Sequence, residues 1–178
     1  LIGTNPRIEA PIINARIRKT WLHNNIKIAN IGTEFDLTYP TQQLKSLADA
    51  TKFFKGAKKP VIILGQAGLA LQDAAQNLAT KIGGTYNYLH TRASAVAALD
   101  LGFATEFDIK KTSLVYLLGE DEIDPAQLKD KFVIYQGHHG DAGAACADII
   151  LPGAAYTEKD GTYLNTEGRV QQTLKALL

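Results

Sequence analysis

Hydrophobic runs of strand length alternate with helical stripes along this chain of 178 residues. Short, mostly apolar runs predict buried strands at 61–64, 114–119, 132–136 and 148–151. The first of these, Val-Ile-Ile-Leu, is apolar at every position, which is typical of a strand covered on both faces. Shorter strand signals lie at 26–32 and 85–89, and residues 1–3 indicate the end of a further buried strand.

Apolar residues at helical spacing predict helices between these strands. Pro11 suits a first helical turn, and it is followed by an apolar face formed by Ile13, Ile17 and Trp21. A second stripe ends at Gly83-Gly84 and comprises Leu71, Ala74, Ala75, Leu78 and Ile82. Thr41 is the expected N-cap of another helix. Further helical segments are expected at 92–101 and after Asp124-Pro125.

Strands separated by helices favour right-handed βαβ units. The predicted fold class is therefore α/β, with a parallel Rossmann-like sheet and helices on both of its faces. Residues 162–165 and 169–173 flank a turn, which predicts an irregular β-arm at the C-terminus. The basic joint at 56–60 suggests a lobe boundary. The expected domains are the end of one α/β lobe, a Rossmann-like lobe and a hairpin tail, over 1–56, 57–152 and 153–178.

The composition is that of a globular domain, with 46% hydrophobic and 21% charged residues. The net charge of +1 predicts no overall attraction to nucleic acid or to an anionic membrane. Apolar stretches of four or five residues are far shorter than the roughly 20 that a membrane span needs, so no membrane insertion is expected. The chain contains no methionine, and we expect it to be part of a longer protein whose opening strand starts earlier.

Ligands of such sheets bind beyond the carboxyl ends of the strands, where four glycine-bearing loops are predicted. These loops are residues 3–6, 65–68, 119–121 and 137–141. Their backbone amides could approach a phosphate, but no loop matches the G-x-G-x-x-G or P-loop pattern. The glycines are therefore better explained by the tight turns themselves.

Metal-ligating and nucleophilic candidates are few. His138 and His139 could form a metal or acid–base site oriented by Asp141, but adjacent residues of an extended segment point to opposite sides. Hydrogen-bonded loop histidines are the favoured interpretation, and no metal site is predicted. Cys146 is the only cysteine, which excludes an intrachain disulfide and a multi-thiolate cluster. Its small apolar neighbours favour a buried, inert thiol, and no catalytic residue is predicted.

Two long segments are more specific than these motifs. Residues 3–19 read GTNPRIEAPIINARIRK, and residues 135–172 begin with YQGHHGD and contain ADIILPGAAYTEK and TYLNTEGRVQQ. Both resemble the large iron–sulfur (75 kDa) subunit of respiratory complex I, in its C-terminal, molybdopterin oxidoreductase-like region. Residues 97–102 are similar but less distinctive. Order and approximate spacing agree along the whole chain.

The resemblance implies a fold that molybdenum enzymes use to hold a pterin dinucleotide, which the complex I subunit generally lacks. Loops equivalent to the Asn5-Pro6 turn and to 161–169 hold that cofactor in the molybdenum enzymes. No cofactor is therefore expected here, and the iron–sulfur clusters belong to the N-terminal part of the parent subunit. The resemblance leaves a set of vestigial cofactor-site candidates, namely Gly3, Asn5, Pro6, Gly137, His138, Gly161, Asn165 and Arg169.

The function implied by the resemblance is that of a structural scaffold in electron transport from NADH to quinone, without catalysis of its own. The expected partners are other complex I subunits and the N-terminal iron–sulfur region. The expected location is the peripheral arm, on the cytoplasmic side of a bacterial inner membrane or on the mitochondrial matrix side. An alternative is a ligand-binding α/β domain that retains a nucleotide or pterin-dinucleotide site. A free-standing hydrolase or reductase is disfavoured because no nucleophile–base arrangement is visible.

Overall fold

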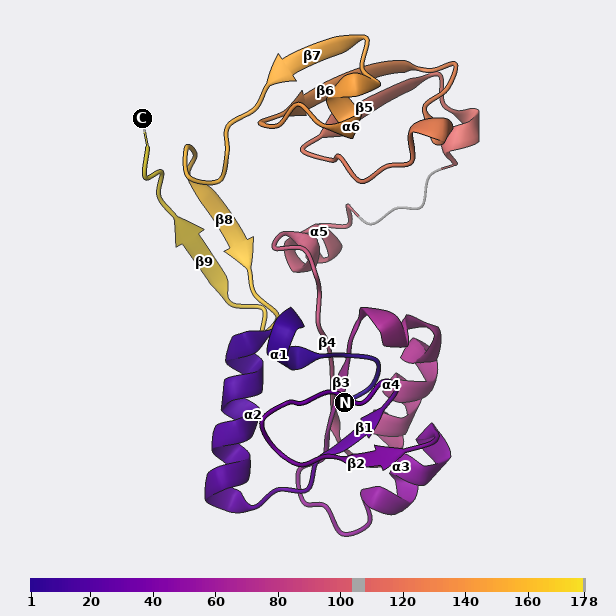
Figure 1. Cartoon of the computed structure of the whole chain (residues 1–178), viewed down its shortest axis with the longest axis vertical. Coiled ribbons are helices and arrows are strands. Elements are labelled where there is room, and N and C mark those ends of the chain that lie inside the picture. Colours follow the sequence, from indigo (N-terminus) through magenta and orange to yellow (C-terminus); the bar gives the residue numbers. More distant parts are fainter. Residues whose placement is uncertain (104–107, 178) are drawn as a thin grey trace. The chain divides into compact units, whose positions relative to one another are not determined.

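The computed structural model describes residues 1–103 and 108–177 (Figure 1). They pack as two compact units. Unit 1 comprises Leu1–Val96 with Thr166–Gly168, and unit 2 comprises Ala97–Asn165 with the residues from Arg169 onward. Each unit has its own hydrophobic core. The division at residues 56 and 152 suggested by the sequence stays a prediction.

Parallel strands form the centre of unit 1. Strand β1 (Ala29–Ile31) pairs with β2 (Gln42–Leu44), and β3 (Val61–Leu64) pairs with β4 (Thr85–Tyr88). Ile2 joins the two pairs through parallel bridges to β1 and β3, and only 4% of its surface is exposed. The predictions of strands within 26–32, at 61–64 and at 85–89 are thus confirmed, and the opening residues lie in the middle of the sheet.

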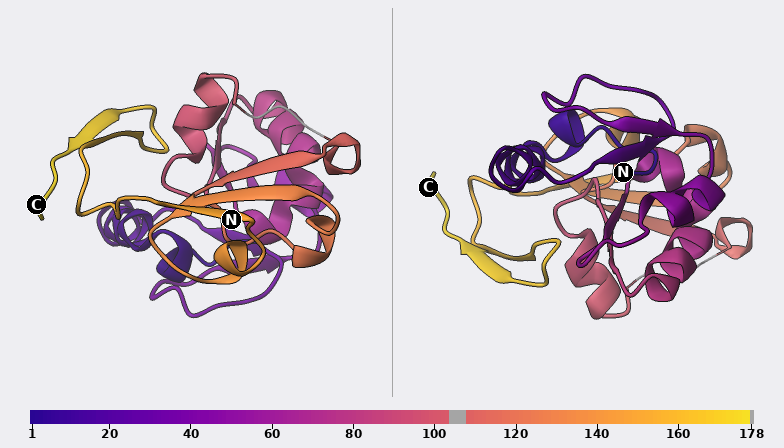
Figure 2. Two further views of the ribbon diagram at one scale, coloured as in Figure 1. Left: turned by 90° about the horizontal axis from the view of Figure 1, so that it is seen from above. Right: turned by 90° about the horizontal axis from the view of Figure 1, so that it is seen from below.

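Helices lie on both sides of these strands. The helices of unit 1 are α1 (Pro6–Glu9), α2 (Pro11–Asn24), α3 (Leu47–Phe53) and α4 (Gln72–Lys81), with a 3-10 segment η1 (Gln66–Leu71) before α4. Both Figure 1 and Figure 2 place α2 on one side of the strands and α3 and α4 on the other. Pro11 opens α2 as predicted, because its fixed φ suits the first helical turn.

Two helix predictions need correction. Thr41 caps no helix: residues 42–44 pair with β1 as a strand, and Ser46 is the N-cap of α3, accepting a hydrogen bond from the Asp49 amide at 3.4 Å. In the second stripe, Leu71 and Ala74 are exposed, and Leu71 belongs to the 3-10 segment η1 because α4 starts only at Gln72. The buried side chains of α4 are Ala75, Leu78 and Ala79.

The core of unit 1 forms between the sheet and the helices α3 and α4. Its buried members are Ile2, Leu44, Ala50, Ile62, Leu64, Ala75, Leu78 and Ala79. Leu64 is fully buried at the centre of this cluster. Because Leu64 comes from β3 and Leu78 from α4, the core fixes the sheet against the helical layer.

Unit 2 contains a three-stranded parallel sheet in the order β5-β6-β7. The strands are β5 (Leu114–Leu118), β6 (Phe132–Gly137) and β7 (Ile149–Pro152). The short helical segments are α5 (Ala95–Asp100), η2 (Ile109–Lys111), η3 (Pro125–Gln127) and α6 (Ala142–Ala145). The first two residues of α5 still belong to unit 1. Alternate side chains of β5 and β6 form the second core with Leu128, namely Val115, Leu117, Val133 and Tyr135. The three strands lie where the sequence predicted them, and so does the Asp124 cap, which accepts from the Ala126 amide at 3.0 Å. The predicted burial is wrong for β7, whose four residues are all exposed, and for alternate residues of β5.

The chain continues from this sheet into an antiparallel hairpin of β8 (Gly161–Leu164) and β9 (Val170–Thr173). This confirms the predicted β-arm. The described residues are therefore mixed α/β with small parallel sheets.

Candidate functional site

The carboxyl edge of the unit 1 sheet holds three of the candidate residues. Gly3 follows the central Ile2 with φ +53°, and its amide donates to the Ile31 carbonyl at 2.9 Å. Asn5 precedes α1, and Pro6 is the fully buried first residue of that helix. Local chain chemistry explains both positions, because glycine adopts positive φ without strain and proline suits a helix start.

The Glu9 carboxylate folds back onto this turn. Its Oε1 accepts a hydrogen bond from the Asn5 amide at 2.5 Å, and its Oε2 accepts one from the Thr4 hydroxyl at 3.1 Å. Thr4 is 2% exposed. A carboxylate of the chain itself therefore occupies the donors that an anionic ligand would use at this edge.

The neighbouring loop after β3 closes the remaining space. A Cβ added to Gly65 would lie 2.6 Å from the Gly3 carbonyl oxygen and 2.8 Å from Glu9 Oε2, and one added to Gly68 would lie 2.8 Å from the Ile2 carbonyl oxygen. The glycines are thus needed for backbone-to-backbone packing. Asn5 Oδ1 is buried here and has no hydrogen-bond partner among the described residues. An acceptor oxygen beside a carboxylate is a poor environment for a pyrophosphate.

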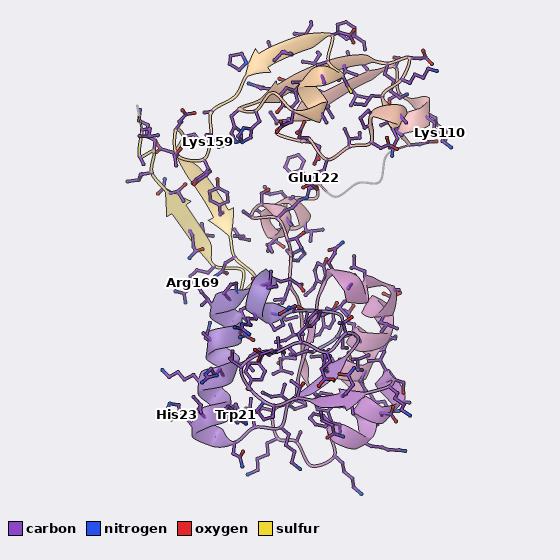
Figure 3. The ribbon with its side chains drawn as sticks, in the orientation of Figure 1. Trp21, His23, Lys110, Glu122, Lys159 and Arg169 are labelled. Atoms are coloured by element: carbon purple, nitrogen blue, oxygen red, sulfur yellow. The ribbon has the colours of Figure 1, made fainter. Side chains whose placement is uncertain are left out.

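A buried polar pair ties the loop before β2 to α2. The Tyr39 hydroxyl donates to Asn14 Oδ1 at 2.7 Å, and Asn14 Nδ2 donates to the Leu37 carbonyl at 3.1 Å. Burial raises the pKa of Tyr39 to about 12 from its ordinary value of 10.0. Trp21 and His23 lie near the far end of the same helix (Figure 3), and Trp21 is the only tryptophan.

This tyrosine is expected to make the fold sensitive to alkali. Unfolded Tyr39 ionises near pH 10 while the folded residue stays neutral to about pH 12, so its contribution to stability is complete below pH 10 and is lost as the pH rises from 10 to 12. The free energy of unfolding should fall by up to about 1.4 kcal/mol per pH unit through this residue. Urea titrations at successive pH values check this, with Tyr39→Phe removing the extra slope and Tyr156→Phe, at a 74% exposed site, leaving it. Parallel slopes for the parent chain and Tyr39→Phe would contradict it.

The carboxyl edge of the unit 2 sheet holds Gly137 and His138. A Cβ at Gly137 would overlap the Tyr135 hydroxyl, which itself donates to the His139 carbonyl at 2.9 Å. His138 and His139 are exposed, with ring centroids 4.1 Å apart, so the expectation that the two side chains point to opposite sides is wrong. Across the described ranges, no group of three or more His, Cys, Asp or Glu side chains is arranged to hold a metal ion.

Two further groups support this loop. Asp121 Oδ1 accepts a short hydrogen bond from the Gly143 amide, so the loop after β5 is joined to α6, which follows the histidine loop. Cys146 packs against the second core but is half-buried rather than buried as predicted, because it lies at the margin of that cluster. Both contacts stabilise the fold around the histidine loop.

The last three candidates lie in the hairpin. The Asn165 amide donates to the Arg169 carbonyl at 3.1 Å, and the Arg169 amide donates to Asn165 Oδ1 at 2.9 Å. Gly161 faces Thr173 across the two strands, and the Thr173 hydroxyl donates to its carbonyl at 3.3 Å. Asn165 and Arg169 thus close the hairpin turn. Arg169 is exposed and lies at the turn end of the hairpin (Figure 3).

Sequence reasoning missed Glu9, and it included Thr4 only as part of the loop 3–6 without identifying it as a partner of Glu9. An acidic residue in the first turn after Asn5 is a recognised helix-start signal, and it could have identified Glu9 as a partner of the turn. Thr4 gives no comparable signal, because its burial depends on the loop after β3.

Comparison with known proteins covers the whole chain. The family model described as molybdopterin oxidoreductase matches residues 1–177. The chain is 47% identical to the mitochondrial 78 kDa subunit of NADH-ubiquinone oxidoreductase from Candida albicans, over 99% of this chain and 28% of that protein. It is 42% identical to the 75 kDa subunit of NADH-ubiquinone oxidoreductase from Reclinomonas americana and 44% identical to a subunit of NADH-quinone oxidoreductase from Rickettsia felis, each over 99% of this chain and 30% of the relative. The chain thus spans less than a third of the length of these relatives.

Proposed function

This chain belongs to the molybdopterin oxidoreductase family, and from that premise we propose that it forms part of the large iron–sulfur subunit of an NADH:quinone oxidoreductase, as a structural scaffold. It is homologous to part of the 75 and 78 kDa subunits along its whole length. In this proposal its strands belong to a Rossmann-like sheet with helices on both faces. The chain carries out no chemistry alone, and it positions neighbouring parts of the complex.

The observation that carries this proposal is a face of the unit 2 sheet that the described part of the chain leaves exposed. The cross-strand pairs Leu114–Phe132, Tyr116–Ile134 and Ile134–Ile149 place their side chains on one face, opposite the second core. The large apolar residues exposed on this face are Leu114, Tyr116, Leu118, Phe132, Ile149 and Leu151. Parallel sheets normally have both faces covered, so this face is suited to packing against another part of an assembly.

The filled edge of unit 1 argues against the ligand-binding alternative. The Asn5 amide and the Thr4 hydroxyl are already used by Glu9, and the loops that carry Gly3 and Gly65 touch. These residues do not fit an anionic dinucleotide, since its phosphates would meet a carboxylate and the buried Asn5 Oδ1. We infer that no pterin dinucleotide is held at this edge.

The proposed partners are the N-terminal iron–sulfur region of the subunit and other complex I subunits. A rigid packed core keeps its neighbours at fixed separations, which is the physical contribution that electron transfer between cofactors requires of a scaffold. The relatives include a mitochondrial and a bacterial protein, so the proposed location is the peripheral arm, on the matrix side or on the bacterial cytoplasmic side. Among the described residues, no helix has the length and hydrophobicity to cross a bilayer.

We expect the exposed sheet face to cause self-association of the isolated chain. Light scattering with size-exclusion chromatography should show a mass that rises with concentration. The double variant Leu114→Lys with Leu118→Lys introduces charge on the face, at side chains 53% and 71% exposed, and should weaken association by at least about tenfold.

The matched control is Val170→Lys with Leu174→Lys, at side chains 64% and 75% exposed outside this face. The control should associate like the parent chain. A strictly monomeric parent chain would contradict the claim that this face packs against another protein surface, and so would a control that associates as weakly as the sheet-face variant. Either result would count against the scaffold proposal.

A further inference from the structure

Charge is divided unevenly along the chain although the total is only +1. Residues 1–96 contain 12 Lys and Arg but 5 Asp and Glu, whereas residues 97–178 contain 7 basic and 13 acidic residues. The overall balance therefore conceals a strongly basic unit 1. A surface that concentrates this excess can select partners by charge.

Part of the excess gathers around an open groove of about 680 Å³ beside β2 and α3. The groove is lined by Lys27, Gln42, Gln43, Leu44, Lys45, Asp49, Lys52, Phe53 and Lys55, and we call it the lysine groove. Within residues 1–103 and 108–177, none of its four lysines forms an ion pair, and all four are exposed. Its one acidic residue, Asp49, accepts a hydrogen bond from Ser46 at the start of α3.

A free strand edge runs along the groove. β2 pairs only with β1 among the described strands. The Gln42 amide donates to the Ile28 carbonyl, toward β1, at 2.9 Å. Peptide groups of successive residues in a parallel strand face opposite neighbours, so the amide and carbonyl of Gln43 face away from β1. These groups are available to an added strand.

We propose that the lysine groove binds an acidic, extended protein segment that adds as a strand to the free edge of β2. Main-chain hydrogen bonds to β2 supply part of the affinity, and carboxylates facing the lysines supply selectivity. Lysines at a sheet edge oppose pairing with neutral or basic strands, and an acidic strand reverses that effect. A nucleic acid fits less well, because Phe53, the one aromatic side chain of the lining, is half-buried and offers no open stacking platform. The proposal does not depend on the scaffold role, since it concerns binding by the chain itself.

The test uses the full chain and a short, fluorescently labelled peptide of alternating Glu and Thr, with anisotropy as the readout. Binding should weaken at least about tenfold in Lys45→Glu with Lys52→Glu, and should weaken as salt rises. The control Lys19→Glu with Lys81→Glu makes the same change of charge on α2 and α4, outside the groove, and should change the affinity less than about threefold. Two further peptides carry N-methyl groups on alternate amides, one on the odd-numbered and one on the even-numbered residues. Only one of the two sets of amides faces β2 in an added strand, so one methylated peptide should lose binding and the other should keep it.

Absence of binding to the parent chain would overturn the proposal, as would equal losses in the groove variant and the control, since these would indicate only the general charge of unit 1. Equal affinity for both methylated peptides would overturn strand addition. A single-stranded oligonucleotide that binds the groove more tightly than the peptide would reassign the surface to nucleic acid. Loss confined to the groove variant and to one methylated phase would support the proposal.

Discussion

Gly3→Ala is expected to destabilise unit 1 by about 2–5 kcal/mol, from left-handed backbone strain of about 1–2 kcal/mol and steric overlap of about 1–3 kcal/mol. Gly3 has φ +53°, and a Cβ there would lie 2.6 Å from Gly68 Cα and 2.7 Å from the Ala67 carbonyl carbon. These atoms are backbone, so no side-chain rotation relieves the overlap. The loops after Ile2 and after β3 would have to separate, which would disturb the centre of the sheet.

A matched control separates the backbone strain from the steric overlap. Gly83 has a similar φ of +63°, but nothing lies within 4 Å of an added Cβ. Gly83→Ala should therefore cost only about 1–2 kcal/mol, the strain alone. Urea unfolding followed by the fluorescence of Trp21 reports on unit 1, where this only tryptophan is located. Equal losses in the two variants would show that the contact between the loops is absent in solution.

Local signals in the sequence predicted most elements correctly. The run at 61–64, the proline at the start of α2 and the Asp124 cap each depend on neighbouring residues, and each appears where it was expected. The prediction of a helix N-cap at Thr41 was wrong, because residues 42–44 pair with β1 and this tertiary contact overrides the local helix signal.

Burial was harder to predict than element type. An apolar run such as 114–118 looks the same whether one face of its strand or both are covered, and in unit 2 Leu118 is 71% exposed. The candidate site shows the same limit. Gly3 and Asn5 were found from their turn, but the carboxylate that fills the turn comes from Glu9, and the closing wall from Gly65, which is distant in sequence. The lysine groove was missed because a net charge of +1 averages over two oppositely charged parts.

Truncation of the central core residue should have an effect of similar size to that of Gly3→Ala. Leu64, the last residue of β3, is fully buried in the cluster that also contains Ile2 and side chains of α3 and α4. Leu64→Ala removes its branched end and leaves a cavity that the packed sheet cannot fill, so we expect a loss of about 2–5 kcal/mol in the free energy of unfolding of unit 1. Leu78→Ala, on the facing side of α4, should fall in the same range.

Leu22→Ala provides the control, because Leu22 is 60% exposed on α2. It should cost less than about 0.5 kcal/mol, the usual range for exposed positions. Leu64 and Leu78 belong to one cluster, so their effects should not be additive. The loss in the free energy of unfolding of the double variant should differ from the sum of the two single losses by at least about 0.5 kcal/mol. A loss below about 0.5 kcal/mol at Leu64 would mean that the sheet does not pack on α4 as described. In that case the rigidity on which the scaffold proposal relies would be missing from unit 1.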